Sequence, residues 1–265
     1  MNRMTGTIVL VVFLTLLSGA PAAAQTAPAP SAAPVAAQAA PAGPTVDQLI
    51  SLKRVGSPAI SPDGKLVAFT VREANWDENA YETEIWIADI AAGTTRQLTN
   101  AKKSSGSPKW SPDGTRIAFT SDRSDKQQIW LIRPSFGEAE QLTHENEGVG
   151  AFDWSPDGTH IAFTMMDPKP EAWKDRDKKY GEFESVDEDQ RVSHLWTFDV
   201  ESKKTKRLTK GAFTVGSFDW SPDGKAIAFD HTVNPDPSNG HTADISVVTV
   251  ADGAIVGTTV VASPN

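Results

Sequence analysis

The sequence has no cysteine among its 265 residues. This absence excludes disulfide bonds, thiolate nucleophiles, zinc–thiolate centres and iron–sulfur clusters held by cysteine. The sequence also lacks a basic excess, because 25 Lys and Arg residues stand against 34 Asp and Glu residues, giving a formal net charge of -9. Affinity for nucleic acid comes mainly from a basic surface, so we expect no nucleic-acid partner.

Motifs for catalysis and cofactor binding are missing as well. No serine has glycine both two positions before it and two positions after it, so the nucleophile elbow of an α/β-hydrolase is absent. The sequence contains no glycine-rich phosphate loop and no HExxH zinc motif. We therefore expect no cofactor, no metal and no catalytic residue in this chain. The five histidines share no metal-ligand spacing, and we interpret each as a surface or turn residue: His144, His160, His194, His231 and His241.

No apolar run at the N-terminus reaches the roughly 20 residues that a membrane-spanning helix needs. The run from Ile8 to Leu17 follows the single charge of Arg3 and precedes three alanines that end at Ala24. This pattern predicts a signal peptide over residues 1–24, cleaved after Ala24, and hence a secreted or periplasmic protein without a stable membrane span. An uncleaved anchor is the alternative. Residues 25–44 are almost entirely Ala and Pro, which predicts a disordered linker.

A four-residue motif, Ser-Pro-Asp-Gly, occurs four times, and each copy precedes an apolar run that ends in Ala-Phe. Proline presets the backbone of an early turn position, aspartate bonds back to the backbone, and glycine takes the positive-φ position. We therefore interpret the motif as a tight turn between two antiparallel strands, and its carboxylates as structural rather than metal-binding. The turn residues are Asp63, Gly64, Asp113, Gly114, Asp157, Gly158, Asp223 and Gly224.

The repeats continue with an Ile-Trp-like pair and then a Leu-Thr pair. The tryptophan and the threonine are 13 residues apart in three repeats, from 86 to 99, 130 to 143 and 196 to 209. Four short strands per repeat, with aromatic residues at fixed positions, are typical of a β-propeller blade. We predict an all-β fold: a partial propeller over residues 45–265, with about four four-stranded antiparallel blades. The blades are expected near residues 56–100, 101–144, 145–210 and 211–265.

The length variation lies in the connection between the second and third strand of each repeat. It is greatest in the third repeat, where residues 167–192 form an insertion rich in acidic side chains. One interpretation is a solvated surface loop. The other is an acidic patch that binds a cationic group such as the free amino terminus of a peptide, with Glu182, Glu184 and Glu188 as candidates. The aromatic residues Trp173, Tyr180 and Phe183 suggest that the insertion packs on something.

Residues 45 to about 255 resemble the N-terminal propeller of the S9 serine peptidases, a family that includes prolyl oligopeptidases, dipeptidyl peptidases and acylaminoacyl-peptidases. The segments DQLISLKRVGSPAISPDGKLVAFT, IAFTSDRSDKQQIWLI and FDWSPDGTHIAF carry the resemblance. Propellers of the TolB type, with WD40-like PD40 repeats, share the Ser-Pro-Asp-Gly motif. In the peptidases an α/β-hydrolase domain with Ser, Asp and His follows the propeller. The repeat spacing would place a fifth motif near residue 271, beyond Asn265, so we expect the catalytic domain to be missing.

The resemblance implies a non-catalytic propeller that selects peptide substrates for a hydrolase domain. The family is a serine-type peptidase, but this chain lacks the triad and is expected to be inactive alone. The expected partner is a peptide substrate in the full-length parent, and open blade edges could also associate. The alternative is a free-standing, TolB-like periplasmic propeller that binds proteins. A complete four-bladed propeller with its own chemistry is a third interpretation.

Overall fold

The computed structural model describes residues 43–135, 137–183 and 190–260. The chain divides into two compact units, residues 1–43 and 44–265, and all elements described below lie in the second unit. The expected signal peptide and most of the expected linker fall outside the described residues. Within the described ranges, no helix combines the length and the apolar character that crossing a bilayer requires.

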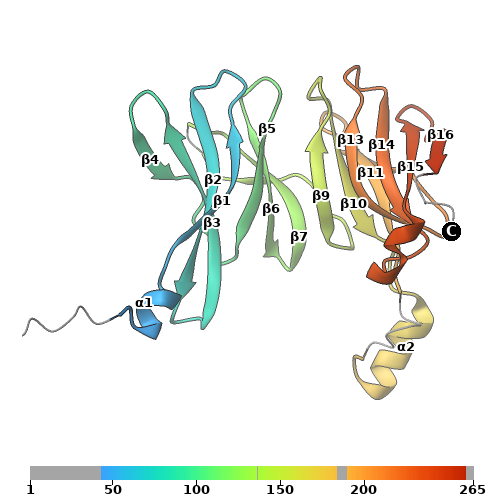
Figure 1. Cartoon of the computed structure of the whole chain (residues 1–265), viewed down its shortest axis with the longest axis horizontal. Helices are drawn as coiled ribbons and strands as arrows, with labels where there is room; N and C mark the ends of the chain where they lie inside the picture. Colours follow the sequence, from blue (N-terminus) through green and yellow to red (C-terminus); the bar gives the residue numbers. More distant parts are fainter. Residues whose placement is uncertain (1–42, 136, 184–189, 261–265) are drawn as a thin grey trace, which may run out of the picture. The chain divides into compact units, whose positions relative to one another are not determined.

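The second unit consists of four antiparallel sheets of four strands, each with its strands in chain order (Figure 1). The first sheet contains β1 (Arg54–Ile60), β2 (Leu66–Asn75), β3 (Ala80–Asp89) and β4 (Thr94–Gln97). The second contains β5 (Ser105–Trp110), β6 (Ile117–Ser124), β7 (Lys126–Ile132) and β8 (Glu140–Gln141). The third contains β9 (Val149–Trp154), β10 (His160–Met166), β11 (Ser193–Asp199) and β12 (Lys204–Arg207). The fourth contains β13 (Thr214–Trp220), β14 (Ala226–Thr232), β15 (Asp244–Thr249) and β16 (Ile255–Val260). The prediction of an all-β partial propeller is confirmed.

Helices are few in the described part of the chain. Helix α1 (Val46–Ile50) begins at Thr45, whose side chain and that of Gln48 form a reciprocal capping box. Helix α2 (Glu171–Tyr180) lies in the β10–β11 connection, and a 3-10 helix (Pro237–Thr242) lies in the β14–β15 connection. Helix α2 was not predicted, because its exposed, highly charged sequence has no apolar stripe of the kind that marks a packed helix.

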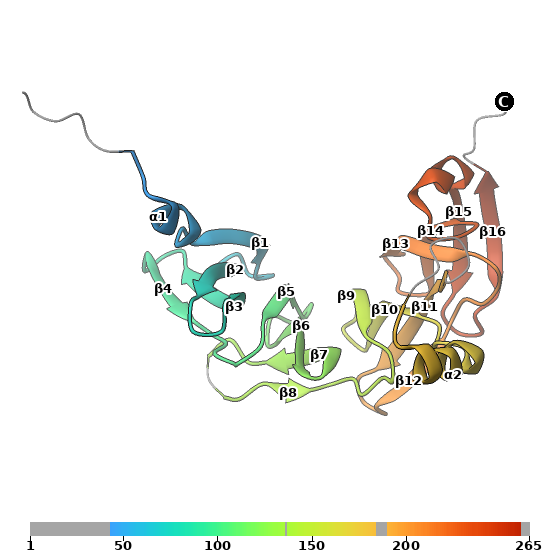
Figure 2. The same cartoon turned by 90° about the horizontal axis from the view of Figure 1, so that it is seen from below.

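Consecutive sheets pack face to face, in chain order (Figure 2). We call the side of a sheet that contacts the preceding sheet its leading face, and the opposite side its trailing face. Ala68 and Ile85 on the trailing face of the first sheet form one core cluster with Ile117 and Phe119 on the leading face of the second. The next two junctions repeat this arrangement. Successive apolar residues along β2, β6, β10 and β14 thus point to opposite faces of each sheet, so that both faces carry apolar side chains.

Candidate functional site

The four Ser-Pro-Asp-Gly segments form nearly identical tight turns between the first two strands of each sheet. In the second sheet, the hydroxyl of Ser111 donates to Asp113 Oδ1 at 2.5 Å and accepts from the backbone N–H of Arg116 at 3.0 Å. Asp113 Oδ1 also accepts from Thr115 N at 3.0 Å, and Gly114 has a φ of 69°. The other three turns repeat this geometry, with their carboxylates at Asp63, Asp157 and Asp223 and their positive-φ glycines at Gly64, Gly158 and Gly224.

Hydrogen bonds inside these turns favour the ionised carboxylates. The serine hydroxyl and the backbone N–H of residue 65 hold the pKa of Asp63 at about 2. The pKa values of Asp113, Asp157 and Asp223 are lowered by the same kind of bonds. These carboxylates are therefore engaged in the turns, and no cluster of potential metal ligands occurs among the described residues.

Charged residues fix both ends of the β10–β11 insertion. Asp167 N donates to Val192 O at 2.9 Å, and Arg191 Nε donates to Asp167 O at 2.7 Å. Arg191 also pairs with Glu147 at 2.7 Å. Arg207, on β12, reaches both carboxylate oxygens of Asp167, at 3.0 and 3.2 Å. We call Glu147, Asp167, Arg191 and Arg207 the insertion anchor; with two acids and two bases, it is balanced in charge.

His194 lies beneath this anchor and is fully buried. The expectation that every histidine is a surface or turn residue is therefore wrong for His194. Its Nδ1 lies 3.2 Å from Thr209 Oγ1, and its Nε2 lies 3.6 Å from Asp167. Burial lowers the pKa of His194, and the charge of Arg207 lowers it further. The imidazole is thus held neutral and serves the packing of the anchor.

Helix α2 and the residues just after it present aromatic and cationic side chains to solvent. Tyr180 is 67% exposed and Phe183 is 47% exposed, whereas Trp173 is half-buried. The expectation that the insertion packs on something is wrong for Tyr180 and Phe183. The guanidinium of Arg176 lies 4.4 Å from the ring centre of Phe183, and the ammonium of Lys179 lies 4.9 Å from that of Tyr180. Exposed aromatic rings beside cations form a surface suited to contacts with another polypeptide.

The acidic candidates of the insertion are only partly visible. Glu182 lies just after the end of α2 and is exposed. Glu184 and Glu188 lie outside the described residues, and the binding of a cationic group by the three glutamates stays a prediction.

Sequence reasoning missed a buried polar pair that recurs in the first three sheets. The threonine of each Leu-Thr pair accepts a backbone N–H from the third strand through its hydroxyl, as in Thr143 Oγ1 to Ile129 N at 2.9 Å. The same hydroxyl contacts the side chain before that residue, as in Thr143 to Gln128 at 2.7 Å. The equivalent pairs are Thr99 with Glu84 and Thr209 with His194. The constant 13-residue spacing was the signal that could have revealed them.

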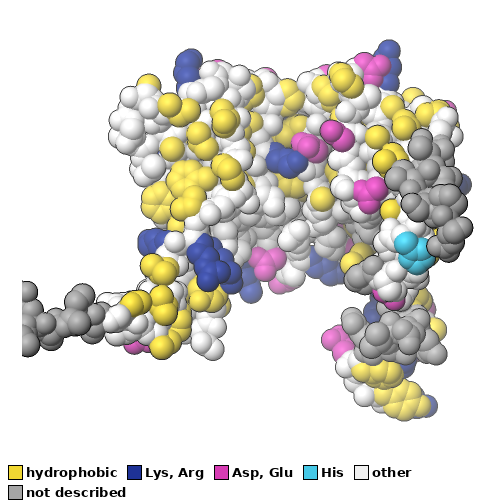
Figure 3. Space-filling model, viewed as in Figure 1, with side chains coloured by type: hydrophobic (Ala, Val, Ile, Leu, Met, Phe, Trp, Pro, Cys, Tyr) yellow, Lys and Arg dark blue, Asp and Glu magenta, His cyan; other side chains and the backbone are white. Residues whose placement is uncertain are grey.

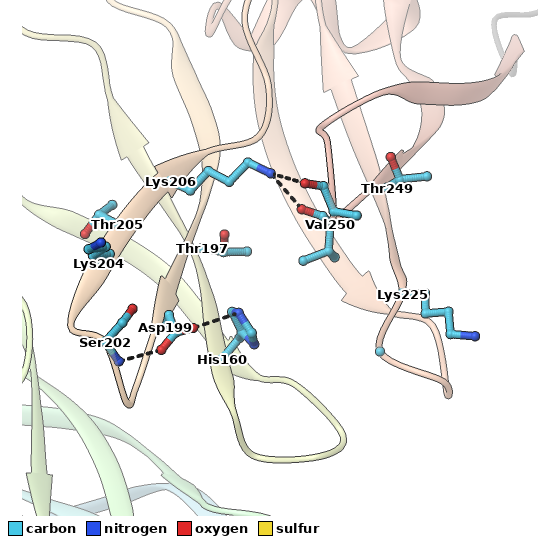
Figure 4. A pocket seen from close by; sticks show the side chains of 12 residues that line it. His160, Thr197, Asp199, Ser202, Lys204, Thr205, Lys206, Lys225, Thr249 and Val250 are labelled. Atoms are coloured by element: carbon cyan, nitrogen blue, oxygen red, sulfur yellow. Dashed lines mark hydrogen bonds and ion pairs between the residues drawn. The ribbon is translucent and has the colours of Figure 1, made fainter.

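A cavity of about 820 Å³ lies between the third and fourth sheets, on the side of the tight turns (Figure 4). Lys206 crosses it and donates to Val250 O at 3.0 Å and to Ala251 O at 2.6 Å. His160 lies 3.5 Å from Asp199. Lys206 is thus engaged across the junction and His160 within the third sheet, so the cavity is a weaker candidate site than the insertion.

Comparisons with known proteins agree with this architecture. The sequence profile of the family described as TolB beta propeller domain, PD40, matches residues 48–186, slightly more than half of the chain. No curated protein sequence matches the chain significantly.

Solved structures with a similar fold include TolB proteins and peptidases. The chain matches TolB from Acinetobacter baumannii with a TM-score of 0.50 and 21% identity, covering 76% of this chain and 41% of that one. It matches an acylaminoacyl peptidase from Pyrococcus horikoshii with a TM-score of 0.57 and 20% identity, over 75% and 31% of the two chains. The β-propeller domain of the Trilobed protease from Pyrococcus furiosus gives 0.53 and 19%, over 80% and 58%. The chain thus spans less than half the length of the Acinetobacter TolB and of the acylaminoacyl peptidase. The likeness establishes the fold.

Proposed function

The chain belongs to the TolB β-propeller domain family, and from this premise we propose that it is a non-catalytic propeller that binds peptides and selects them for an S9-type serine peptidase. The observation that carries the proposal is the anchored insertion. Asp167 and Arg191 fix its two ends, while Tyr180 and Phe183 remain exposed. Loops on a rigid scaffold are where binding usually resides.

The acidic side chains of the insertion give the proposed site its chemical specificity. Glu182 lies in sequence between the exposed aromatic residues Tyr180 and Phe183, and Glu184 and Glu188 follow. A carboxylate forms charge-assisted hydrogen bonds with an ammonium group. We therefore assign the free amino terminus of a short peptide to these glutamates and its side chains to the aromatic surface.

Fluorescence anisotropy with the full chain tests the proposal. The probes are a hexapeptide labelled near its C-terminus and the same peptide with an acetylated amino terminus. We expect the free-amine peptide to bind about tenfold more tightly, since a hydrogen bond to a charged group is worth about 1.5–3 kcal/mol. The Glu182→Gln variant should lose this preference, and Tyr180→Ser should weaken the binding of both peptides.

The matched control is Lys225→Gln, which changes an exposed charge on the tight-turn side and should leave binding unchanged. The proposal is wrong if neither peptide binds at millimolar concentration, or if acetylation has no effect and Tyr180→Ser binds normally.

The family match also supports a second candidate function, a free-standing propeller that binds folded proteins, as in our alternative interpretation of the sequence. Cross-linking mass spectrometry separates the two functions, because α2 carries the exposed Lys178 and Lys179. Cross-links from these lysines to one folded envelope protein, without peptide binding, would favour the alternative.

We also propose that the protein is exported to the periplasm or secreted. The support is the sequence pattern of Arg3, the apolar run Ile8 to Leu17 and the alanines before Gln25. N-terminal sequencing of protein from an envelope fraction should begin at Gln25. A first residue at or near Met1 would contradict cleavage.

A further inference from the structure

The cavity between the third and fourth sheets contains a buried hydroxyl group without a hydrogen-bond partner. Thr197, on β11, lines this cavity and is 3% exposed, and no residue in the described part of the chain bonds to its hydroxyl. The equivalent residue, which pairs with the alanine of the Ala-Phe run, is apolar in the other three sheets: Ile87, Leu131 and Val247. Because buried polar groups are normally hydrogen-bonded, the hydroxyl of Thr197 indicates a place for a ligand.

The strand pairing of the third sheet places cationic side chains next to this hydroxyl. Thr197 pairs with Lys206 of β12, while Asp199 pairs with His160 of β10 on one side and with Lys204 of β12 on the other. Side chains that are opposite each other, or two residues apart on one strand, point to the same face of a sheet. All five residues line the cavity, and Figure 4 shows Thr197 between Lys206 and His160.

The lining of the cavity is positively charged, although the chain as a whole has a net charge of -9. It contains Lys204, Lys206 and Lys225 but only one carboxylate, that of Asp199. This carboxylate accepts two backbone N–H groups of the β11–β12 turn, at 2.7 and 3.0 Å, so its charge is already engaged. On the face drawn in Figure 3, by comparison, several basic side chains lie beside acidic ones. The cavity is therefore suited to an anion.

Lys206 retains one donor for such an anion. Its ammonium group donates to Val250 O at 3.0 Å and to Ala251 O at 2.6 Å, whereas a lysine ammonium has three donors. The two bonds also hold Nζ in place across the junction, so that less side-chain freedom is lost when the third donor binds a ligand. Because Lys206 is directly opposite Thr197 in the strand ladder, an ammonium and a hydroxyl donor lie side by side.

A smaller groove occupies the equivalent place between the first and second sheets. Its volume is about 270 Å³, against about 820 Å³ for the cavity. Leu66 and Ile87 line this groove where the cavity has His160 and Thr197. The third sheet packs on the second sheet, and the groove is open all the same, so the packing of a further sheet does not fill this place in the fold. The polar lining is specific to the junction between the third and fourth sheets.

We propose that this cavity binds a small phosphate monoester, with its phosphate group between Lys206 and Thr197 and its organic part against Val250. A phosphate group carries a charge of about -1.5 to -2 at pH 7 and has three strong acceptor oxygens, which match the two donors and the cationic lining. Small-molecule sites typically have volumes of about 300–1,000 Å³. A cavity of about 820 Å³ therefore has room for the organic part as well.

Isothermal titration calorimetry of the full chain at pH 7.5 tests the proposal with phenyl phosphate, inorganic phosphate and benzoate. We expect phenyl phosphate to bind most tightly. Inorganic phosphate should bind more weakly because it lacks an apolar part, and benzoate at least tenfold more weakly because it is a monoanion with two oxygens. Thr197→Val and Lys206→Gln should each weaken the binding of phenyl phosphate about tenfold, the effect of losing one hydrogen bond to a charged group.

Two matched variants are the controls. Thr95→Val changes an exposed threonine of β4, and Lys65→Gln changes an exposed lysine of the first tight turn; both should bind phenyl phosphate as the wild type does. Thr197→Val should fold, because Val247 occupies the equivalent position in the fourth sheet, and circular dichroism checks this.

Methyl NMR spectroscopy locates the bound probe. Phenyl phosphate should shift the methyl resonances of Thr197 and Val250, which line the cavity, and leave that of Thr95 unchanged.

Three results would overturn the proposal: phenyl phosphate that produces neither heat nor methyl shifts up to about 10 mM, Thr197→Val and Lys206→Gln variants that both bind it as the wild type does, or benzoate that binds as tightly. The insertion lies in the β10–β11 connection, at the opposite end of the strands from the tight turns. None of these results therefore bears on peptide binding by the insertion, and the two proposals stand or fall separately.

Discussion

At the residue scale, one position of the third strand carries a different polar residue in each of the first three sheets but makes the same contact. It directly precedes the buried Ile85, Ile129 or Leu195. Glu84, Gln128 and His194 each contact the hydroxyl of a buried threonine. The sequence predicted the spacing of those threonines but not their partners, because side chains of such different charge do not form a recognisable motif. What they share is one polar atom within reach of the hydroxyl, which keeps a buried polar group satisfied.

The neutral His194 gives a pH prediction. Its pKa is lowered in the folded state by burial and by Arg207, with Asp167 opposing, whereas the unfolded chain retains the ordinary value of about 6.5. Below that value the unfolded state binds a proton that the folded state does not, so stability is full above pH 6.5 and falls as the pH drops towards the folded pKa. His194→Gln, which copies Gln128, should reduce this loss.

Urea unfolding at pH 5.5 and 7.5 measures the effect. The difference between the two midpoints should be larger for the wild type than for His194→Gln. Equal differences would show that His194 does not contribute to the pH dependence.

At the element scale, the turns were predictable and the helix of the insertion was not. Ser, Pro, Asp and Gly each impose a local backbone preference, so the turn follows from four adjacent residues. The insertion is fixed differently, by Arg191 and Arg207 acting on Asp167 from positions 24 and 40 residues further along the chain. Contacts between such distant residues produce no repeating pattern in the sequence. The insertion could therefore be predicted from the sequence, but its anchor could not.

The anchor should control the local stability of the insertion. Asp167→Ala removes the carboxylate that Arg207 pairs with, so the segment from 168 to 183 should open more readily. Hydrogen–deuterium exchange of its backbone amides should accelerate roughly fivefold to tenfold, while exchange in β5 and β6 stays unchanged. Glu171→Ala, which removes an exposed pair with Lys174, is the control and should have a much smaller effect. Unchanged exchange in Asp167→Ala would show that the anchor is not required.

At the scale of the whole molecule, locked intervals between motifs made the four sheets and their order predictable from sequence. The spacing could not show how the sheets contact each other, because the bonds between them join distant residues. The indole Nε1 of Trp154 donates to Lys109 O of the preceding sheet, 45 positions away, and that of Trp220 donates to Asp153 O, 67 positions away. Each sheet contacts its neighbours along the chain, so stability depends on the separate junctions, much as in repeat proteins.

A substitution at one junction should therefore destabilise the molecule measurably. Trp154→Phe removes the hydrogen bond from the indole Nε1 to Lys109 O. Because Trp154 is only 6% exposed, the smaller ring also leaves a small void in the junction. We expect a loss of about 1–3 kcal/mol in the free energy of unfolding, measured by urea titration. Trp76→Phe, at a tryptophan that is 57% exposed, should cost much less. Similar losses in the two variants would contradict the role of the indole in the junction.

The connections between second and third strands have a practical consequence. Their lengths differ widely between sheets, yet the strands on either side keep their antiparallel pairing. In the second sheet this connection is a short bend at Asp125, whose φ is 75°. The third sheet already accommodates the long β10–β11 insertion at the equivalent connection. A foreign epitope inserted at Asp125 should therefore be tolerated, so the molecule offers a carrier that displays grafted sequences without redesign of its sheets.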